Sequence, residues 1–170
     1  MEEQPSKWKI IKKIFKRGGK PIALLIDGPN ILRRVAGDQV RLEYIEDAAR
    51  ELGKIQLAKV FLNRHAPEKL LQAISNSGFN PVVALGDIHV AMAMETMILL
   101  HESNVKTLVI ASRHARAAIL LRKAKEQGLE TVAIGFDPGF SIALQNTADY
   151  VFKLRTPKHG RVSHTDDDEY

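Results

Sequence analysis

Cysteine is absent from the 170 residues of this sequence. A disulfide framework is therefore excluded, and so is a thiolate metal site. Aromatic residues make up only 6% of the chain, which disfavours any binding mode built on a row of exposed rings. No apolar run approaches the length of a membrane span, and no signal-peptide pattern opens the chain. Together these absences predict a protein of a reducing cytoplasm with no transmembrane segment.

The rest of the composition is that of an ordinary globular protein, with 45% hydrophobic residues. The length allows one domain with a proper core. A net charge of +5 favours a polyanionic partner but carries no information on the fold. We expect the domain at residues 21–154, preceded by a basic amphipathic arm at residues 1–20 and followed by a flexible charged tail at residues 155–170.

The first 20 residues are rich in lysine and arginine, with apolar residues at helical spacing among them. Trp8, Ile11 and Phe15 would give such a helix one apolar face and leave the other face cationic. Three interpretations stay open: the helix packs on the domain, lies along a nucleic-acid backbone, or makes peripheral contact with an anionic membrane surface. In the second interpretation the phosphate-binding residues are Lys12, Lys13, Lys16 and Arg17.

Short apolar runs alternate with amphipathic segments along the rest of the chain. Strands are predicted at residues 22–26, 55–62, 81–85, 105–111, 130–134 and 150–154. Helices are predicted at residues 30–35, 42–53, 67–75, 89–101, 114–127 and 141–145, with Met92, Met94 and Met97 packed in the core. The alternation predicts a three-layer, Rossmann-like α/β fold whose mainly parallel sheet has about five to six strands.

The sharpest of these transitions is PIALLIDGPN, residues 21–30. A buried parallel strand there would end at Asp27, on the sheet edge where open α/β folds bind their ligands. Asp27 with Asn30 could hold a divalent cation, or Asp27 could simply cap the next helix. The other strand-to-helix turns reach the same edge and contain Asn63, Arg64, His65, Asp87, His89, Ser112, Arg113, His114 and Arg116. These side chains form one pocket for phosphate, with or without a metal ion, or they are ordinary caps and solvated loop residues.

Two stretches, LLIDGPNIL (residues 24–32) and PGFSIALQNTADYVFKL (residues 138–154), are similar to the NYN domain, a branch of the PIN-like nucleases. The stretch GDIHVAMAMETM (residues 86–97) and residues 108–135 match mainly in pattern. Within the family the chain resembles most an archaeal group of uncharacterised proteins related to the LabA family. The resemblance implies a PIN-like form of the Rossmann-like fold over residues 21–154.

The resemblance also implies an activity, the metal-dependent cleavage of RNA. Acidic side chains at the carboxyl edge of the sheet would hold Mg²⁺ or Mn²⁺, whose bound water attacks a phosphodiester. Asp27 and Asn30 match the family's first aspartate and the asparagine after it. Asp87 and His89 occupy the turn that usually carries one or two aspartates, and Glu95 stands where many members have a carboxylate. The resemblance therefore implies catalytic roles for Asp27, Asp87 and Glu95 and metal binding by Asp27 and Asp87. His89 and His114 stand where the family has acids, and they could serve as further metal ligands or as proton carriers.

The sequence departs from the family's pattern after the fourth strand, where His114 and Arg116 stand in place of two aspartates. Arg116 cannot ligate a metal, and His114 suits Mn²⁺ or Zn²⁺ better than Mg²⁺. One hypothesis is a ribonuclease with a modified metal site, in which Asn30, Arg113 and Arg116 hold phosphate. The other is an RNA-binding module or a protein-interaction scaffold without catalysis. A homodimer stays open under both.

Overall fold

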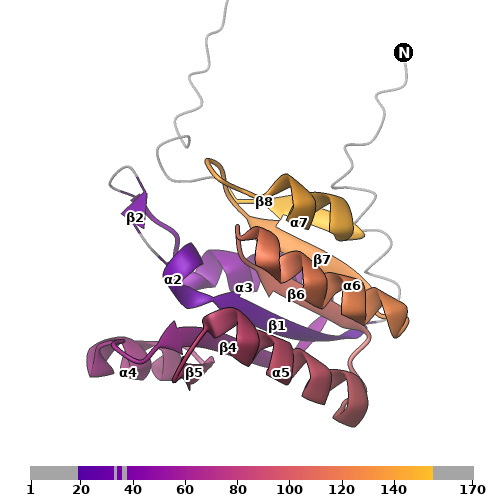
Figure 1. Cartoon of the computed structure of the whole chain (residues 1–170). Coiled ribbons are helices and arrows are strands. Elements are labelled where there is room, and N and C mark those ends of the chain that lie inside the picture. Colours follow the sequence, from indigo (N-terminus) through magenta and orange to yellow (C-terminus); the bar gives the residue numbers. More distant parts are fainter. Residues whose placement is uncertain (1–18, 33, 36–37, 155–170) are drawn as a thin grey trace, which may run out of the picture.

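A computed structural model of the chain describes residues 19–32, 34–35 and 38–154. Its centre is a sheet of six parallel strands in the order β5-β4-β1-β6-β7-β8 (Figure 1). The strands are β1 (Pro21–Asp27), β4 (Lys54–Asn63), β5 (Asn80–Ala84), β6 (Thr107–Ala111), β7 (Glu130–Gly135) and β8 (Tyr150–Lys153). The predicted α/β fold with its parallel sheet is confirmed. The predicted N-terminal arm up to residue 18, with Lys12, Lys13, Lys16 and Arg17, and the tail at residues 155–170 lie outside the described residues.

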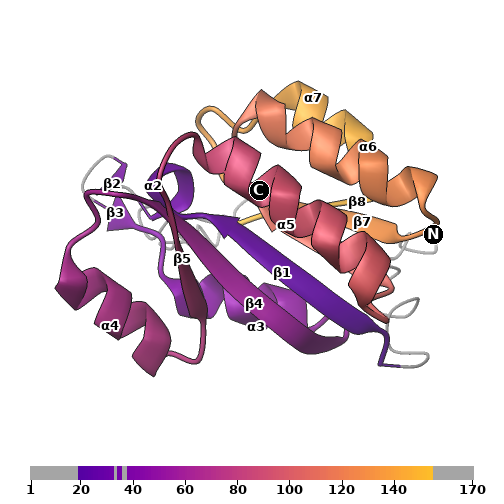
Figure 2. The same cartoon turned by 60° about the horizontal axis from the view of Figure 1, so that its bottom comes forward.

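Helices cover both faces of the sheet and complete the three predicted layers (Figure 2). On one face lie α3 (Leu42–Arg50) and α4 (Glu68–Asn76); on the other lie α5 (Ile88–Glu102), α6 (Ala118–Glu126) and α7 (Ile142–Thr147). Neighbouring residues of a strand point to opposite faces, so β1 feeds both layers. Leu24 and Ile26 pack on the α3 side, and Leu25 packs on the α5 side. None of the described helices is long and apolar enough to cross a membrane.

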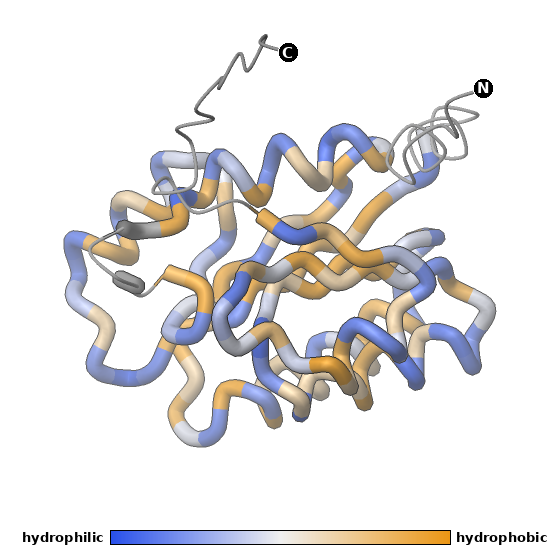
Figure 3. The backbone as a smooth tube through the Cα atoms, turned by 90° about the horizontal axis from the view of Figure 1, so that it is seen from above, coloured by the Kyte–Doolittle hydropathy of each residue, from blue (hydrophilic) through white to orange (hydrophobic). Residues whose placement is uncertain are grey.

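The apolar residues are concentrated in the strands, and most of the surrounding helices alternate between apolar and polar residues (Figure 3). All five residues of β6 and six of the seven residues of β1 are buried. Strands buried on both faces read as continuous apolar runs rather than as alternating ones. For this reason the short runs in the sequence located the central strands correctly.

The chain between β1 and α3 differs from the sequence-based expectation. The predicted helix at residues 30–35 is wrong: α2 (Gly28–Ile31) is a single turn, and β2 (Arg34–Val35) and β3 (Asp38–Gln39) then form a separate antiparallel pair. Ile31 and Leu32 at the end of this turn pack on the core. Likewise a short 3₁₀ turn, η1 (Ala115–Ala117), precedes α6 in place of one continuous helix.

The strand order reverses at β1, because β4 and β5 add to one side of it and β6, β7 and β8 add to the other. Ile26 of β1 lies opposite Ala111 of β6, so the next residues, Asp27 and Ser112, meet at the carboxyl edge. In open α/β sheets this reversal point is where ligands bind. Gly28 lets the following turn pack closely, since a Cβ there would lie 2.5 Å from the backbone oxygen of Phe61.

Candidate functional site

Asp27 is the buried carboxylate of the carboxyl edge, with only 3% of its surface exposed. The hydroxyl of Ser112 donates a hydrogen bond of 3.1 Å to Asp27 Oδ2. The same Ser112 oxygen accepts a 3.1 Å hydrogen bond from the backbone N–H of His114. Ser112 therefore ties the end of β1 to the turn after β6, a role that the sequence analysis did not assign. A hydroxyl directly after a buried strand was the available signal.

His89, on the first turn of α5, lies between two carboxylates. Its Nε2 is 3.3 Å from Asp27 Oδ2, and its Nδ1 is 3.4 Å from Asp87 Oδ1. The first distance suits an ion pair, but Nε2 is buried and its geometry does not form a hydrogen bond with any described residue. The His114 ring packs beside His89 with 4.8 Å between ring centroids. The structure thus brings Asp27, Asp87, His89 and His114 together, as predicted.

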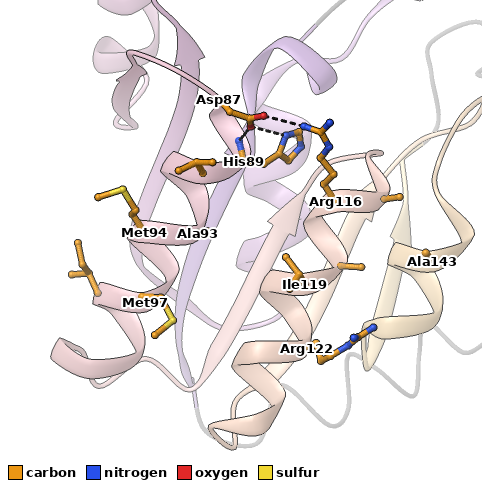
Figure 4. Close-up of a pocket in the computed structure, with 13 residues that line it drawn as sticks. Asp87, His89, Ala93, Met94, Met97, Arg116, Ile119, Arg122 and Ala143 are labelled. Atoms are coloured by element: carbon orange, nitrogen blue, oxygen red, sulfur yellow. Dashed lines mark hydrogen bonds and ion pairs between the residues drawn. The ribbon is translucent and has the colours of Figure 1, made fainter.

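Asp87 is exposed, and each of its two carboxylate oxygens accepts a hydrogen bond within the fold. Its Oδ1 accepts a 2.7 Å hydrogen bond from the backbone N–H of His89 and so caps α5. Its Oδ2 accepts a 2.9 Å hydrogen bond from Arg116 Nη1. The His89 N–H is the main reason that the pKa of Asp87 lies below its ordinary value, and the charges of His89 and Arg116 act in the same direction. Figure 4 shows Asp87, His89 and Arg116 converging at one end of a groove.

Arg113 and Asn30 hold the protein's own backbone. The Arg113 backbone N–H donates to Asn30 Oδ1 at 2.6 Å. Its guanidinium donates to the backbone oxygens of Pro138 and Asn30 and stacks 4.4 Å above the Phe136 ring. Arg113 was expected to grip phosphate, but it is 9% exposed and is directed into the fold. Its role, and that of the Asn30 carboxamide, is to fasten three loops together.

Glu95 lies further along α5, almost two helical turns after His89. Its carboxylate forms an ion pair with Lys59 of β4, and both side chains are largely buried. This pairing joins α5 to the sheet. It differs from the catalytic or ligand role that the resemblance implied for Glu95.

The residues present do not fit the divalent-metal site that the resemblance implied. Within the described part of the chain, no three histidine, aspartate or glutamate side chains come together in a way that could hold a metal ion. Asp27 and Asp87 stand on opposite sides of the His89 ring, and Arg116 takes one oxygen of Asp87. Mg²⁺ needs several oxygen ligands in near-octahedral geometry, and this arrangement offers two carboxylates separated by an imidazole.

The groove beside this cluster has a volume of about 900 Å³ and runs between α5 and α6 (Figure 4). Apart from Asp87, His89, Arg116 and Arg122, its lining is apolar. Met92 is buried as predicted, but Met94 and Met97 are 64% and 40% exposed and line the groove. The prediction that all three methionines belong to the core is therefore wrong for two of them.

The family model of the NYN domain matches residues 21–155. An uncharacterized protein of Methanocaldococcus jannaschii is 44% identical over 147 residues, which are 86% of this chain and 60% of the relative. The chain thus spans less than two thirds of that relative's length. A crystal structure of a protein of unknown function from Vibrio parahaemolyticus has a TM-score of 0.70 and 16% identity, covering 82% of this chain and 95% of the other. At that identity the likeness concerns the fold alone.

Proposed function

The chain belongs to the NYN domain family, and from this premise we propose that it is an RNA-binding domain that receives phosphate without a divalent metal. Membership suggests the PIN-like nuclease superfamily, in which metal-dependent cleavage would require carboxylates that face a shared ion. In this chain an arginine, Arg116, pairs with Asp87 at that edge.

One observation carries the proposal: Arg116 Nη1 lies 2.9 Å from Asp87 Oδ2. The guanidinium of Arg116 therefore occupies the carboxylate of Asp87, and a metal ion would have to displace it. A guanidinium has five N–H donors and matches phosphate in a bidentate way. The Arg116 side chain is 64% exposed, so donors beyond Nη1 remain accessible to a ligand from solvent.

Other cationic or titratable donors follow strands at the same edge of the sheet as Arg116. Arg64 and His65 follow β4, and His114 follows β6; all three are exposed. Histidine can take up a proton near neutral pH and then donate from both ring nitrogens. These groups would contact several successive phosphates of a single strand, and the release of counterions would supply much of the affinity.

The test is a titration of the full chain with labelled single-stranded RNA, in EDTA and in Mn²⁺, that scores both binding and cleavage. We expect equal affinity in the two buffers, no cleavage, and a loss of about tenfold or more in affinity as salt rises from low to physiological concentration. Arg116→Ala should weaken binding about fivefold and lower the slope of log affinity against log salt by about one.

Arg50→Ala is the matched control. Arg50 also forms an ion pair, with Glu46, and its side chain is also 64% exposed, but it lies on α3. This variant should leave the salt slope unchanged. Binding that needs Mn²⁺, or Mn²⁺-dependent cleavage that disappears in Asp27→Asn, would overturn the proposal and favour a nuclease with a modified metal site.

A further inference from the structure

Helix α5 carries apolar residues on every side. Met92 and Leu99 face the core and are buried. Val90, Met94 and Ile98 face outward and are 58%, 64% and 47% exposed. A helix that is hydrophobic all round is normally covered on all sides. In the described part of this chain, its outer side is open.

The opposite wall of the groove comes from α6, and α7 borders it. Ile119 of α6 is 66% exposed and lines the groove, and Ala143 of α7 also contacts it. Figure 4 shows Met97 on α5 and Ile119 on α6, with Met94 on the side of α5 that is turned away from α6. The groove with the outward side chains of α5 is called the α5–α6 face below. Its apolar side chains Val90, Met94, Met97, Ile98 and Ile119 are between 40% and 66% exposed, and exposed apolar side chains gathered on one face mark an interaction site.

We propose that the α5–α6 face binds a second copy of this chain in a two-fold symmetric dimer. A standard interface has an apolar centre and a polar rim, and this face combines an apolar groove with the charged residues Asp87, Arg116 and Arg122 in its lining. The face also has a shape that can be complementary to itself, because it contains both a ridge and a groove. The outward residues of α5, Met94 and Ile98, form a ridge, and the space between α5 and α6 forms a groove.

A two-fold axis places the same patch on both partners, so each ridge can enter the other copy's groove. Two other occupants, the segment at residues 1–20 and a nucleic acid, suit the face less well. The arginines Arg116 and Arg122 line it and would repel the lysine-rich segment at residues 1–20. A nucleic acid needs polar and cationic groups along its path, whereas nine of the thirteen residues that line the groove are apolar.

The groove ends at Asp87, His89 and Arg116, so the second copy would lie directly beside the proposed phosphate site. The dimer does not depend on that site, and the two proposals can fail separately. Dimerisation is read from the protein alone, without RNA.

The experiment is sedimentation velocity on the full chain between about 1 and about 100 µM, a range that resolves dissociation constants near 1 µM to 1 mM. We expect the wild type to shift from monomer to dimer as the concentration rises. Met94→Glu and Ile119→Glu should each raise the dissociation constant at least tenfold, because each places a charge in the apolar centre of the contact. Tyr44→Glu is the control, since Tyr44 is 44% exposed on α3, the opposite layer.

The absence of cysteine provides a second measurement. Met94→Cys combined with Ile119→Cys should give a disulfide-linked dimer under mild oxidation, because each ridge would enter the groove that Ile119 of the other copy lines, and Tyr44→Cys should remain monomeric under the same conditions. A wild type that stays monomeric at the highest concentration would overturn the proposal and leave the groove to the N-terminal segment or another partner. A dimer that survives both glutamate substitutions, with their fold intact by circular dichroism, would overturn it as well.

Discussion

Asp149 and Asp27 are carboxylates at opposite edges of the same sheet, and their surroundings differ. Asp149 Oδ2 accepts hydrogen bonds of 2.9 Å from both the N–H and the hydroxyl of Thr131, and Oδ1 lies 3.1 Å from Lys125 Nζ. Burial alone would raise the pKa of Asp149, but the hydrogen bonds from Lys125 and Thr131 outweigh burial and lower it. All of these donors favour the ionised form.

Asp27 is more deeply buried than Asp149, and its carboxylate has fewer donors around it. Ser112 is the one hydrogen-bond donor to its side chain among the described residues, and the nearby His89 nitrogen is not aligned for a hydrogen bond. The comparison separates the two edges of the sheet: the fold supplies three donors to the Asp149 carboxylate and one hydrogen-bond donor to the Asp27 carboxylate. A carboxylate with several donors contributes more to the stability of the fold than one with a single donor.

The largest effect should come from removing the carboxylate with several donors. Asp149→Ala leaves the Thr131 donors without their acceptor, and we expect the free energy of unfolding to fall by about 2–3 kcal/mol. Urea denaturation measures the change, and RNA affinity should not move. Asp137→Ala is the control, since Asp137 forms an exposed ion pair with Lys153 and should cost less than about 0.5 kcal/mol. Equal losses in the two variants would remove the contrast between the edges.

Asp27→Asn should affect stability less than Asp149→Ala. The asparagine carbonyl can still accept from Ser112, so we expect a loss of less than about 1 kcal/mol. Because a negative charge disappears next to the proposed phosphate site, RNA affinity in EDTA should stay equal or rise about twofold to threefold. A clear drop in affinity would contradict the metal-free site, and Asp149→Asn provides the comparison at the other edge.

The smallest effect concerns pH. The pKa of Asp87 is lower in the folded chain than its ordinary value of 3.8. Its ionised form therefore stabilises the fold above that value, and the contribution is lost as the pH falls through the folded pKa. The difference in unfolding free energy between wild type and Asp87→Asn should be constant above about pH 5 and shrink below pH 4. A difference that grows on acidification would have the wrong sign.

The sequence alone was sufficient to predict the edge of the sheet on which the polar residues of the candidate site lie. A buried run such as residues 22–26 fixes a strand, and parallel connections bring all strand ends to one side. Asp27, Asp87, His89 and His114 therefore converge as predicted. The family could also be predicted from the NYN-like stretches of the sequence, since the family model matches residues 21–155.

Side-chain partners on that edge could not be read from the sequence. Arg113 and Arg116 stand three positions apart, yet Arg113 turns into the fold toward Pro138 and Arg116 turns outward to Asp87. Periodicity also failed on α5. An amphipathic helix reveals its inner face by its pattern, but α5 is apolar on all sides, so nothing in the sequence distinguished buried Met92 from exposed Met94.

The position of β1 has a consequence for how the molecule assembles. Asp27 and Ser112 are 85 positions apart in the chain, yet they share one hydrogen bond. A central strand that is made first must wait for β6 before its second side is paired, and such distant contacts slow folding. A nascent chain that ends before Thr107 can pair β1 with β4 and β4 with β5, but it lacks β6 and has only half of the reversal point. The carboxyl edge at Asp27 is therefore completed only when β6 joins β1, so the hydrogen bond between Asp27 and Ser112 marks the joining of the two halves of the sheet.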